Sequence, residues 1–202
     1  MVIQLPKLYR YVISSDIYER HYLMAHLASR FDPQNILDFG GEGVLSYFIN
    51  SNVAVDTVNV NSKGNIPYHN MQIAVKDKAY DVVVSLDTFE HIDRKFRPVL
   101  VNELCRIARK GVVIAAPYGS PEHIQHEKHI LKNLPSTTNP VFAKYLQEHI
   151  QHGLPTEHEM KSYFDPDTVS CYYAGRFDVQ ILPRSGWLRW SRLGKSIMDP
   201  EI

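Results

Sequence analysis

Short apolar runs are the feature of this chain that most limits its fold. Residues 80–86 form the clearest run, shorter ones span residues 35–39 and 112–116, and a segment rich in valine and threonine spans residues 53–60. A run as uninterrupted as 80–86 is typical of a strand that is buried on both faces of a parallel sheet. Because helical patterns separate the runs, we predict an α/β protein: a Rossmann-like, doubly wound, mostly parallel sheet with helices on both faces.

The helices are predicted from apolar spacing and from their end signals. Apolar side chains recur at helical spacing after Asp16, which we take as the N-cap of a helix over residues 16–30. A second helix is predicted near residues 94–109, with Gly111 just past its basic end in the C-cap region. The polar stretch over residues 61–78 is predicted to be a loop.

We predict one domain with three parts. Asp165 and Pro166 match the N-cap and the first residue of a late helix, which would end at Gly175 and lead into a strand over residues 177–182. The three parts are a cofactor-binding core (16–117), a lid or insertion over the carboxyl ends of the strands (118–164), and a C-terminal helix, strand and tail (165–202).

The overall charge is balanced, since the 202 residues include 22 basic and 22 acidic side chains. Such a chain offers no broad surface for phosphates, so nucleic acid is not an expected partner. No stretch reaches the roughly 18 apolar residues of a membrane-spanning helix, and we predict no signal peptide. Cys105 and Cys171 lie far apart in apolar contexts, which favours reduced, buried thiols and a cytoplasmic protein.

A glycine-rich turn follows the first predicted strand. Open α/β sheets bind ligands at the carboxyl ends of their strands, near the point where the strand order reverses. Glycines let the backbone approach a ligand closely, and they adopt dihedral angles that other residues avoid. A tight turn without a ligand would have the same composition, so the turn alone does not identify a site. Its residues are Asp38, Phe39, Gly40, Gly41, Glu42 and Gly43.

Three segments of the chain resemble the motifs of one enzyme family, in the same order. Residues 36–40 enter the glycine turn, residues 78–92 read Lys-Ala-Tyr-Asp-Val-Val-Val-Ser-Leu-Asp-Thr-Phe-Glu-His-Ile, and residues 103–114 form a helix and strand pattern. Across residues 15–117 the chain resembles the class I S-adenosylmethionine (SAM)-dependent methyltransferases, in particular the type 11/type 23 group. Residues 146–155 resemble a segment of some sugar- and glycan-cluster methyltransferases.

The resemblance implies SAM as the cofactor and a role for each motif residue. Asp38 and the backbone of residues 40–43 would face the amino-acid part of SAM. Asn59, at the end of the second strand, would face the ribose. The residues close to the sulfonium would be Ser85, Leu86 and Asp87.

Two positions depart from the pattern of that family. The glycine turn is one residue shorter than Asp-x-Gly-x-Gly-x-Gly, and Asn59 stands where an acidic residue usually closes the second strand. A carboxylate accepts both ribose hydroxyls, whereas an amide offers one acceptor oxygen, which would weaken SAM binding by roughly 1–3 kcal/mol. The departures favour an alternative function, a methyltransferase-like binding or scaffold protein that does not catalyse.

Ten histidines are many for this length, and six lie between residues 123 and 158. His123 and His126 follow the strand that ends at Pro117, and His91 follows the run at 80–86, so each is a candidate general base. Polar lid surface and a hydrogen bond at a helix start are the alternatives. The second histidine after His126 comes one position too early for the H-E-x-x-H zinc motif, so we predict no metal site. Residues 122–126 recur as residues 148–152.

The predicted function is methyl transfer from SAM to an O or N atom of a small molecule, with a sugar or glycan intermediate as one option. The scaffold alternative and a third reading, another nucleoside ligand on the same fold, stay open. Residues 187–197 combine two tryptophans with basic side chains. Such a tail packs on its own domain or makes peripheral contact with a membrane surface or partner.

Overall fold

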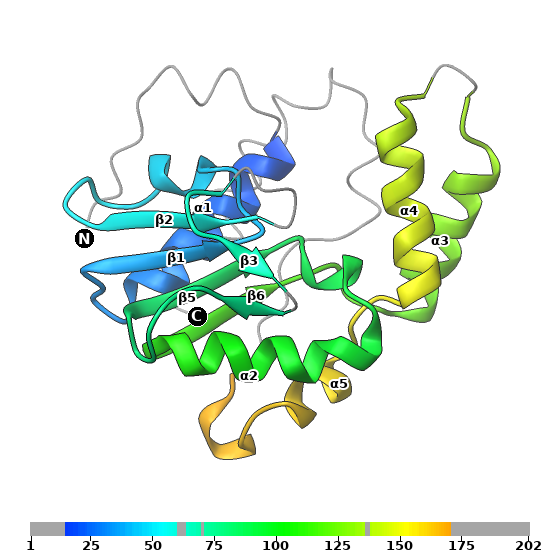
Figure 1. Cartoon of the computed structure of the whole chain (residues 1–202). Helices are drawn as coiled ribbons and strands as arrows, with labels where there is room; N and C mark the ends of the chain where they lie inside the picture. The colour runs from blue at the N-terminus through cyan, green and yellow to red at the C-terminus, as the bar shows by residue number, and fades with distance from the viewer. Residues whose placement is uncertain (1–14, 60–63, 70, 136–137, 171–202) are drawn as a thin grey trace, which may run out of the picture.

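Parallel strands form the centre of the molecule. The computed structural model describes residues 15–59, 64–69, 71–135 and 138–170. Its main sheet is parallel and has the strand order β2-β1-β5-β6 (Figure 1). The strands are β1 (Asn35–Phe39), β2 (Ala54–Val58), β5 (Tyr80–Leu86) and β6 (Ala108–Ala115).

Helices cover both faces of this sheet. Helix α1 (Ser15–Ser29) lies on one face and α2 (Arg97–Ile107) on the other (Figure 1). Side chains of β5 alternate between the two faces: Val82 and Val84 pack in the core under α1, and Val83 packs in the core under α2. All three valines are fully buried, so the predicted Rossmann-like α/β class is confirmed.

The strand order reverses between β1 and β5. Phe39, the last residue of β1, pairs with Val58 of β2 on one side and with Ser85 of β5 on the other. The chain runs from β1 outward to β2 and then returns across β1 to begin β5. The connections after β1 and β5 therefore leave in opposite directions, and a crevice between two such strands is where open α/β sheets bind ligands.

The loop predicted over residues 61–78 contains a small antiparallel hairpin, so that prediction was wrong in part. Strands β3 (Tyr68–His69) and β4 (Gln72–Ile73) form it. Strands of two residues are too short to give a periodic pattern. The Glu103 carboxylate of α2 accepts a hydrogen bond from the Ile73 backbone N–H at 2.8 Å, which attaches the hairpin to the helix.

The boundary between α2 and β6 also differs from the prediction. Helix α2 ends at Ile107 and β6 starts at the next residue, so Gly111 lies inside the strand and is not a C-cap. The basic residues expected to end the helix, Arg109 and Lys110, instead bind the Asp81 carboxylate of β5 at 2.8 and 3.3 Å. The local sequence does not encode this contact between neighbouring strands.

Of the two predicted N-caps, one is confirmed. Asp16 lies inside the first turn of α1, so its prediction as an N-cap was wrong. The Asp165 carboxylate accepts a hydrogen bond from the backbone N–H two residues on at 3.1 Å, but it caps only the short 3₁₀ turn η5 (Pro166–Thr168). Gly175, the strand predicted over residues 177–182 and the tail lie outside the described residues.

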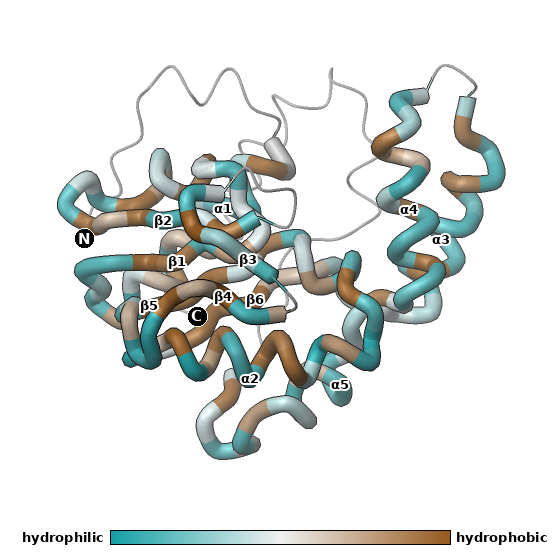
Figure 2. The backbone as a smooth tube through the Cα atoms, in the orientation of Figure 1, coloured by the Kyte–Doolittle hydropathy of each residue, from teal (hydrophilic) through white to brown (hydrophobic). Residues whose placement is uncertain are grey.

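Three helices occupy the segment predicted as a lid. They are α3 (Pro121–Lys132), α4 (Pro140–His152) and α5 (Glu157–Ser162). Helices α3 and α4 lie side by side and are mostly hydrophilic, in contrast to the apolar strands (Figures 1 and 2). Helix α4 contacts the 3₁₀ turn η3 (Phe89–His91), which follows β5. Within the described part of the chain, no helix has both the length and the apolar character to cross a bilayer.

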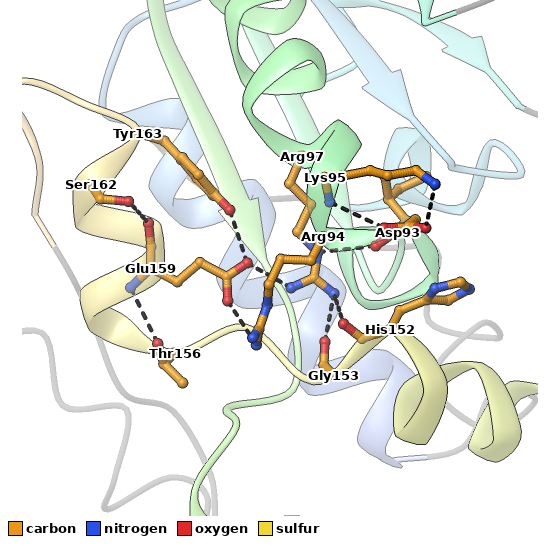
Figure 3. A network of polar contacts seen from close by, with 11 residues as sticks. Asp93, Arg94, Lys95, Arg97, His152, Gly153, Thr156, Glu159, Ser162 and Tyr163 are labelled. Carbon is orange, nitrogen blue, oxygen red and sulfur yellow. Dashed lines mark hydrogen bonds and ion pairs between the residues drawn. The ribbon is translucent and has the colours of Figure 1, made fainter.

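A buried arginine ties this segment to the core. Arg97 begins α2, and none of its side chain is exposed. Its guanidinium binds the Glu159 carboxylate of α5 at 2.8 Å and donates to the carbonyl oxygens of Ile92, His152 and Gly153 (Figure 3). One side chain therefore holds the end of α4 and the helix α5 against the start of α2.

We expect Arg97→Ala to lower the free energy of unfolding by about 3–5 kcal/mol, because it leaves the Glu159 carboxylate without its buried partner. Urea unfolding followed by circular dichroism measures this change. The matched control is Arg94→Ala, since Arg94 Nη2 lies 3.2 Å from the same carboxylate but has a side chain that is 58% exposed. Exposed ion pairs contribute about 0–1 kcal/mol. Equal losses in the two variants would contradict the anchoring role of Arg97.

Candidate functional site

An open pocket lies at the reversal point between β1 and β5. Its volume is about 350 Å³, within the range of roughly 300–1,000 Å³ that is typical of small-molecule sites. Its lining consists of acidic and glycine residues of the two strand ends, residues of α1 and Tyr145 of α4. The predicted cofactor-binding residues in this lining are Asp38, Gly40, Gly41, Glu42, Leu86 and Asp87.

Glycine is required at two positions of the turn after β1. Gly40 has a φ of +88°, and a Cβ there would lie 1.9 Å from Thr88 Oγ1. A Cβ at Gly41 would lie 1.9 Å from Asp38 Oδ2. The turn thus closes tightly around the Asp38 carboxylate and presents bare backbone to the pocket.

Asn59, directly after β2, holds this turn. Its side-chain amide donates to the carbonyl oxygens of Gly40 at 3.2 Å and Gly41 at 3.4 Å. A carboxylate at this position could donate neither hydrogen bond. The amide of Asn59 and the conformation of the glycine turn are therefore physically connected. A contact of Asn59 with a cofactor ribose stays a prediction.

A buried carboxylate, that of Asp38, lies at the base of the pocket. It is 3% exposed, and none of the described residues donates a hydrogen bond to it. Burial raises the pKa of Asp38 to about 7, because removal of water destabilises the charged form. Near neutral pH the carboxyl group is therefore divided between its protonated and ionised forms, and a cationic ligand group would favour the ionised form.

Helix α1 supplies a wall of the pocket that the sequence did not identify. Its lining residues include Arg20 and His21, and the Arg20 guanidinium forms an ion pair with Asp87. His21 Nδ1 lies 2.8 Å from the Ile17 carbonyl oxygen, so this nitrogen carries the hydrogen and Nε2 carries the lone pair. Burial lowers the pKa of His21, which favours the neutral ring. Helical spacing puts these side chains on one face, but only the tertiary structure brings that face to the pocket.

Gly43 and Ser85 lie outside the lining of the pocket. Gly43 has a φ of +85° and precedes the 3₁₀ turn η2 (Val44–Tyr47). Ser85 is fully buried in β5, and its hydroxyl has no hydrogen-bond partner among the described residues. The cofactor contacts assigned to both residues from the family resemblance stay predictions.

A second polar cluster lies where η3 meets α3 and α4. His91 Nδ1 is 2.8 Å from Glu148 Oε2, and His149 Nδ1 is 2.9 Å from Glu127 Oε1. The His91 ring centroid lies 4.8 Å from that of His149 and 4.9 Å from that of Tyr145. Because Tyr145 also lines the pocket, the cluster and the pocket are neighbours.

Two carboxyl groups of this cluster have opposite electrostatic properties. Burial, followed by the charge of Asp87, raises the pKa of Glu90 to about 8. Burial acts in the same direction on Glu127, but hydrogen bonds from His123 and His149 outweigh it and lower the pKa of Glu127 to about 2. The cluster therefore combines a carboxyl group that resists ionisation with one that is firmly ionised.

The three histidines predicted as catalytic bases separate in the structure. His91 lies within the cluster, and His123 Nε2 lies at its edge, 3.5 Å from Glu127 Oε1. His126 lines a different hollow, together with His129 of the same helix. None of the three predicted bases lines the pocket, and a catalytic role for each stays a prediction.

The sequence named His91 and His123 of this cluster as candidate bases, and both copies of the sequence repeated at residues 122–126 and 148–152 contribute to it. His123 and His149 occupy equivalent positions in the two copies, and both approach the same oxygen of Glu127, at 3.5 and 2.9 Å. The sequence alone could not show that the two copies face each other, because this depends on how α3 packs against α4.

Solved structures similar to this chain are distant in sequence. No protein-family model and no curated protein matches the chain. A SAM dependent methyltransferase from Archaeoglobus fulgidus has 16% identity and a TM-score of 0.43, with 70% of this chain and 73% of that chain covered. A chain of the complex that contains the Haloferax volcanii Trm112 methyltransferase activator has 15% identity and a TM-score of 0.42, with 74% and 68% covered.

We expect Asp38→Asn to raise the free energy of unfolding at pH 8 by on the order of 3 kcal/mol, because a buried charge is replaced by a neutral amide. The pKa of Asp38 is raised by burial from 3.8 to about 7, so the folded protein keeps a proton that the unfolded chain has lost in this range. The free energy of unfolding of the wild type therefore falls as the pH rises from about 4 to about 7. The advantage of Asp38→Asn disappears below this range.

Urea unfolding of both proteins between pH 4 and pH 8 measures the difference. The matched control is Glu42→Gln, which removes an exposed carboxylate from the same turn and reports the general effect of losing one negative charge. A constant difference between Asp38→Asn and the wild type over the whole range would contradict the raised pKa.

Proposed function

We propose that this chain is a SAM-dependent methyltransferase. The observation that supports it most is the chemistry of the pocket at the reversal point. A glycine turn presents bare backbone there, and the carboxylates of Asp38, Glu42 and Asp87 border the same space. SAM carries two cationic groups, a sulfonium and an ammonium, and a pocket rich in carboxylates suits such a ligand.

The amino-acid part of SAM has partners of both signs in this pocket. The Asp38 carboxylate lies at the glycine turn and is the group that would bind the ammonium. The Arg20 guanidinium, which pairs with Asp87, lies on helix α1 and would bind the carboxylate of the ligand. Groups of opposite charge at different positions in the pocket would fix the orientation of the cofactor.

Methyl transfer needs little covalent help from the protein, because the sulfonium is already activated as a leaving group. The enzyme aligns the acceptor atom with the methyl group and, for a hydroxyl or protonated amine, removes a proton. A histidine accepts a proton only in its neutral form, and its side chain must reach the pocket. His21 meets both conditions, since its pKa is lowered by burial and its side chain lines the pocket.

The proposed acceptor is an O or N atom of a small molecule. The sugar or glycan option came from residues 146–155, and this stretch has a structural explanation. Leu146 and Leu154 are buried, and the Gly153 carbonyl accepts a hydrogen bond from Arg97. These residues hold the end of α4 to the core, so their resemblance does not identify the acceptor.

Isothermal titration calorimetry should detect micromolar binding of SAM at pH 8 and about tenfold weaker binding at pH 6. The reason is that the ionised fraction of a carboxyl group with a pKa of about 7 rises roughly tenfold between these pH values. Binding of the cation releases the proton, so affinity increases with pH.

S-adenosylhomocysteine separates the two cationic contacts, because it keeps the ammonium and lacks the sulfonium charge. The same pH dependence for both ligands is expected if Asp38 binds the ammonium, and Asp38→Asn should remove it for both. No binding of either ligand to a folded sample would contradict the proposed function.

A further inference from the structure

Three side chains of metal-ligating type converge next to the pocket. Glu90 and His91 lie on η3, directly after β5, and His149 lies on α4. One potential ligand atom from each lies within 4.8 Å of the others. His149 Nε2 is 4.0 Å from Glu90 Oε1. The sequence predicted no metal site because these residues come from segments far apart in the chain.

Two polar atoms of this group are buried without a hydrogen-bond partner among the described residues. They are Glu90 Oε2 and His149 Nε2. Glu90 is only 1% exposed, so bulk water does not solvate its carboxylate. Native proteins rarely leave such atoms unsatisfied, and each case calls for an explanation such as an ion.

Both histidines have a carboxylate on Nδ1, as metal-binding histidines often do. His91 Nδ1 contacts the Glu148 carboxylate at 2.8 Å, and His149 Nδ1 contacts the Glu127 carboxylate at 2.9 Å. A carboxylate only accepts hydrogen bonds, so Nδ1 of each ring carries the hydrogen and Nε2 carries the lone pair. A carboxylate on the far nitrogen fixes the ring and raises its basicity as a ligand.

Two imidazoles and one carboxylate form a ligand set that suits Zn²⁺ and related divalent transition metals, and it leaves a coordination position open. Ligand atoms about 2.1 Å from a tetrahedral Zn²⁺ lie about 3.4 Å apart. The separation of 4.0 Å between His149 Nε2 and Glu90 Oε1 therefore needs to shorten by about 0.6 Å, and separations of up to 4.8 Å within the group by up to about 1.4 Å, around an ion of this kind.

We propose that Glu90, His91 and His149 bind one divalent transition-metal ion of the Zn²⁺ type, with Glu127 and Glu148 as positioning residues. Purely structural packing of α4 on η3 accounts for the hydrogen bonds on the Nδ1 atoms. It does not account for the two buried atoms that find no hydrogen-bond partner within the described part of the chain. The site adjoins the SAM pocket through Tyr145 but shares no ligand with its lining, so the inference does not depend on the proposed function.

The test is titration of the EDTA-treated full chain with Zn²⁺ by calorimetry and with Co²⁺ by visible absorption. We expect one equivalent of each ion to bind with micromolar or tighter affinity, and the Co²⁺ spectrum to indicate four- or five-fold coordination with nitrogen ligands. Mg²⁺, which prefers oxygen ligands, should not compete at equal concentration.

Variants assign the ligands. His149→Ala and Glu90→Gln should each weaken Zn²⁺ binding at least about 100-fold, and Glu127→Gln should weaken it about 10–100-fold with one equivalent still bound. The matched control is His129→Ala, an exposed histidine of α3, which should bind as the wild type does. Circular dichroism and a SAM titration on each variant show whether the fold and the neighbouring pocket are intact.

Failure of this inference can be told apart from failure of the proposed function. If the wild type binds neither Zn²⁺ nor Co²⁺, or if one equivalent binds unchanged in His149→Ala and Glu90→Gln, the metal site is overturned. That outcome leaves SAM binding untouched. Zn²⁺ binding that is lost in these variants, in a protein that binds no SAM, would support the metal site and remove the methyltransferase proposal.

Discussion

The position of the whole segment after the sheet depends on the buried guanidinium of Arg97. Its hydrogen bonds reach the Ile92 carbonyl just before α2, the carbonyls at the end of α4 and the Glu159 carboxylate of α5. Removal of such a group would leave several buried acceptors without a donor, which costs more than the loss of any exposed ion pair. Because the end of α4 is attached here, the helix is held against η3, and the cluster of histidines and carboxylates can form.

The pocket follows from a different constraint, the reversal of strand order between β1 and β5. It brings the turn after β1 next to the end of β5, so residues such as Gly41 and Asp87 meet across one crevice. The Asp38 carboxylate is buried under that turn with no hydrogen bond from the described residues, a local arrangement that opposes stability. Residues with strongly perturbed pKa values in a cleft are typical of functional sites.

The sequence predicts the sheet well because its signals there are local. The apolar runs of β1 and β5 match the observed strands to the residue, since burial on both faces excludes other patterns. Gly111 was misplaced because the basic residues before it bind a neighbouring strand. The contact between His91 and Glu148 joins residues that are 57 positions apart, and no local pattern predicts such a pair. Six of the nine predicted cofactor residues line the pocket, because they lie at the ends of β1 and β5, where the strand order reverses; their contact with a cofactor stays a prediction.

Helices α3 and α4 bury few side chains, so apolar patterns in the sequence predict this part of the chain poorly. The polar side chains buried there are chemically informative. Glu127 is the buried residue of α3 among those described, and Leu146 is that of α4. A helix pair with so little apolar contact gains little from the hydrophobic effect. Its polar contact across the pair is that of Glu127 on α3 with His149 on α4, and His123 approaches the same carboxylate from within α3. Buried polar networks specify one arrangement only when their members are satisfied, so the bonding state of the cluster and the packing of these two helices are physically coupled.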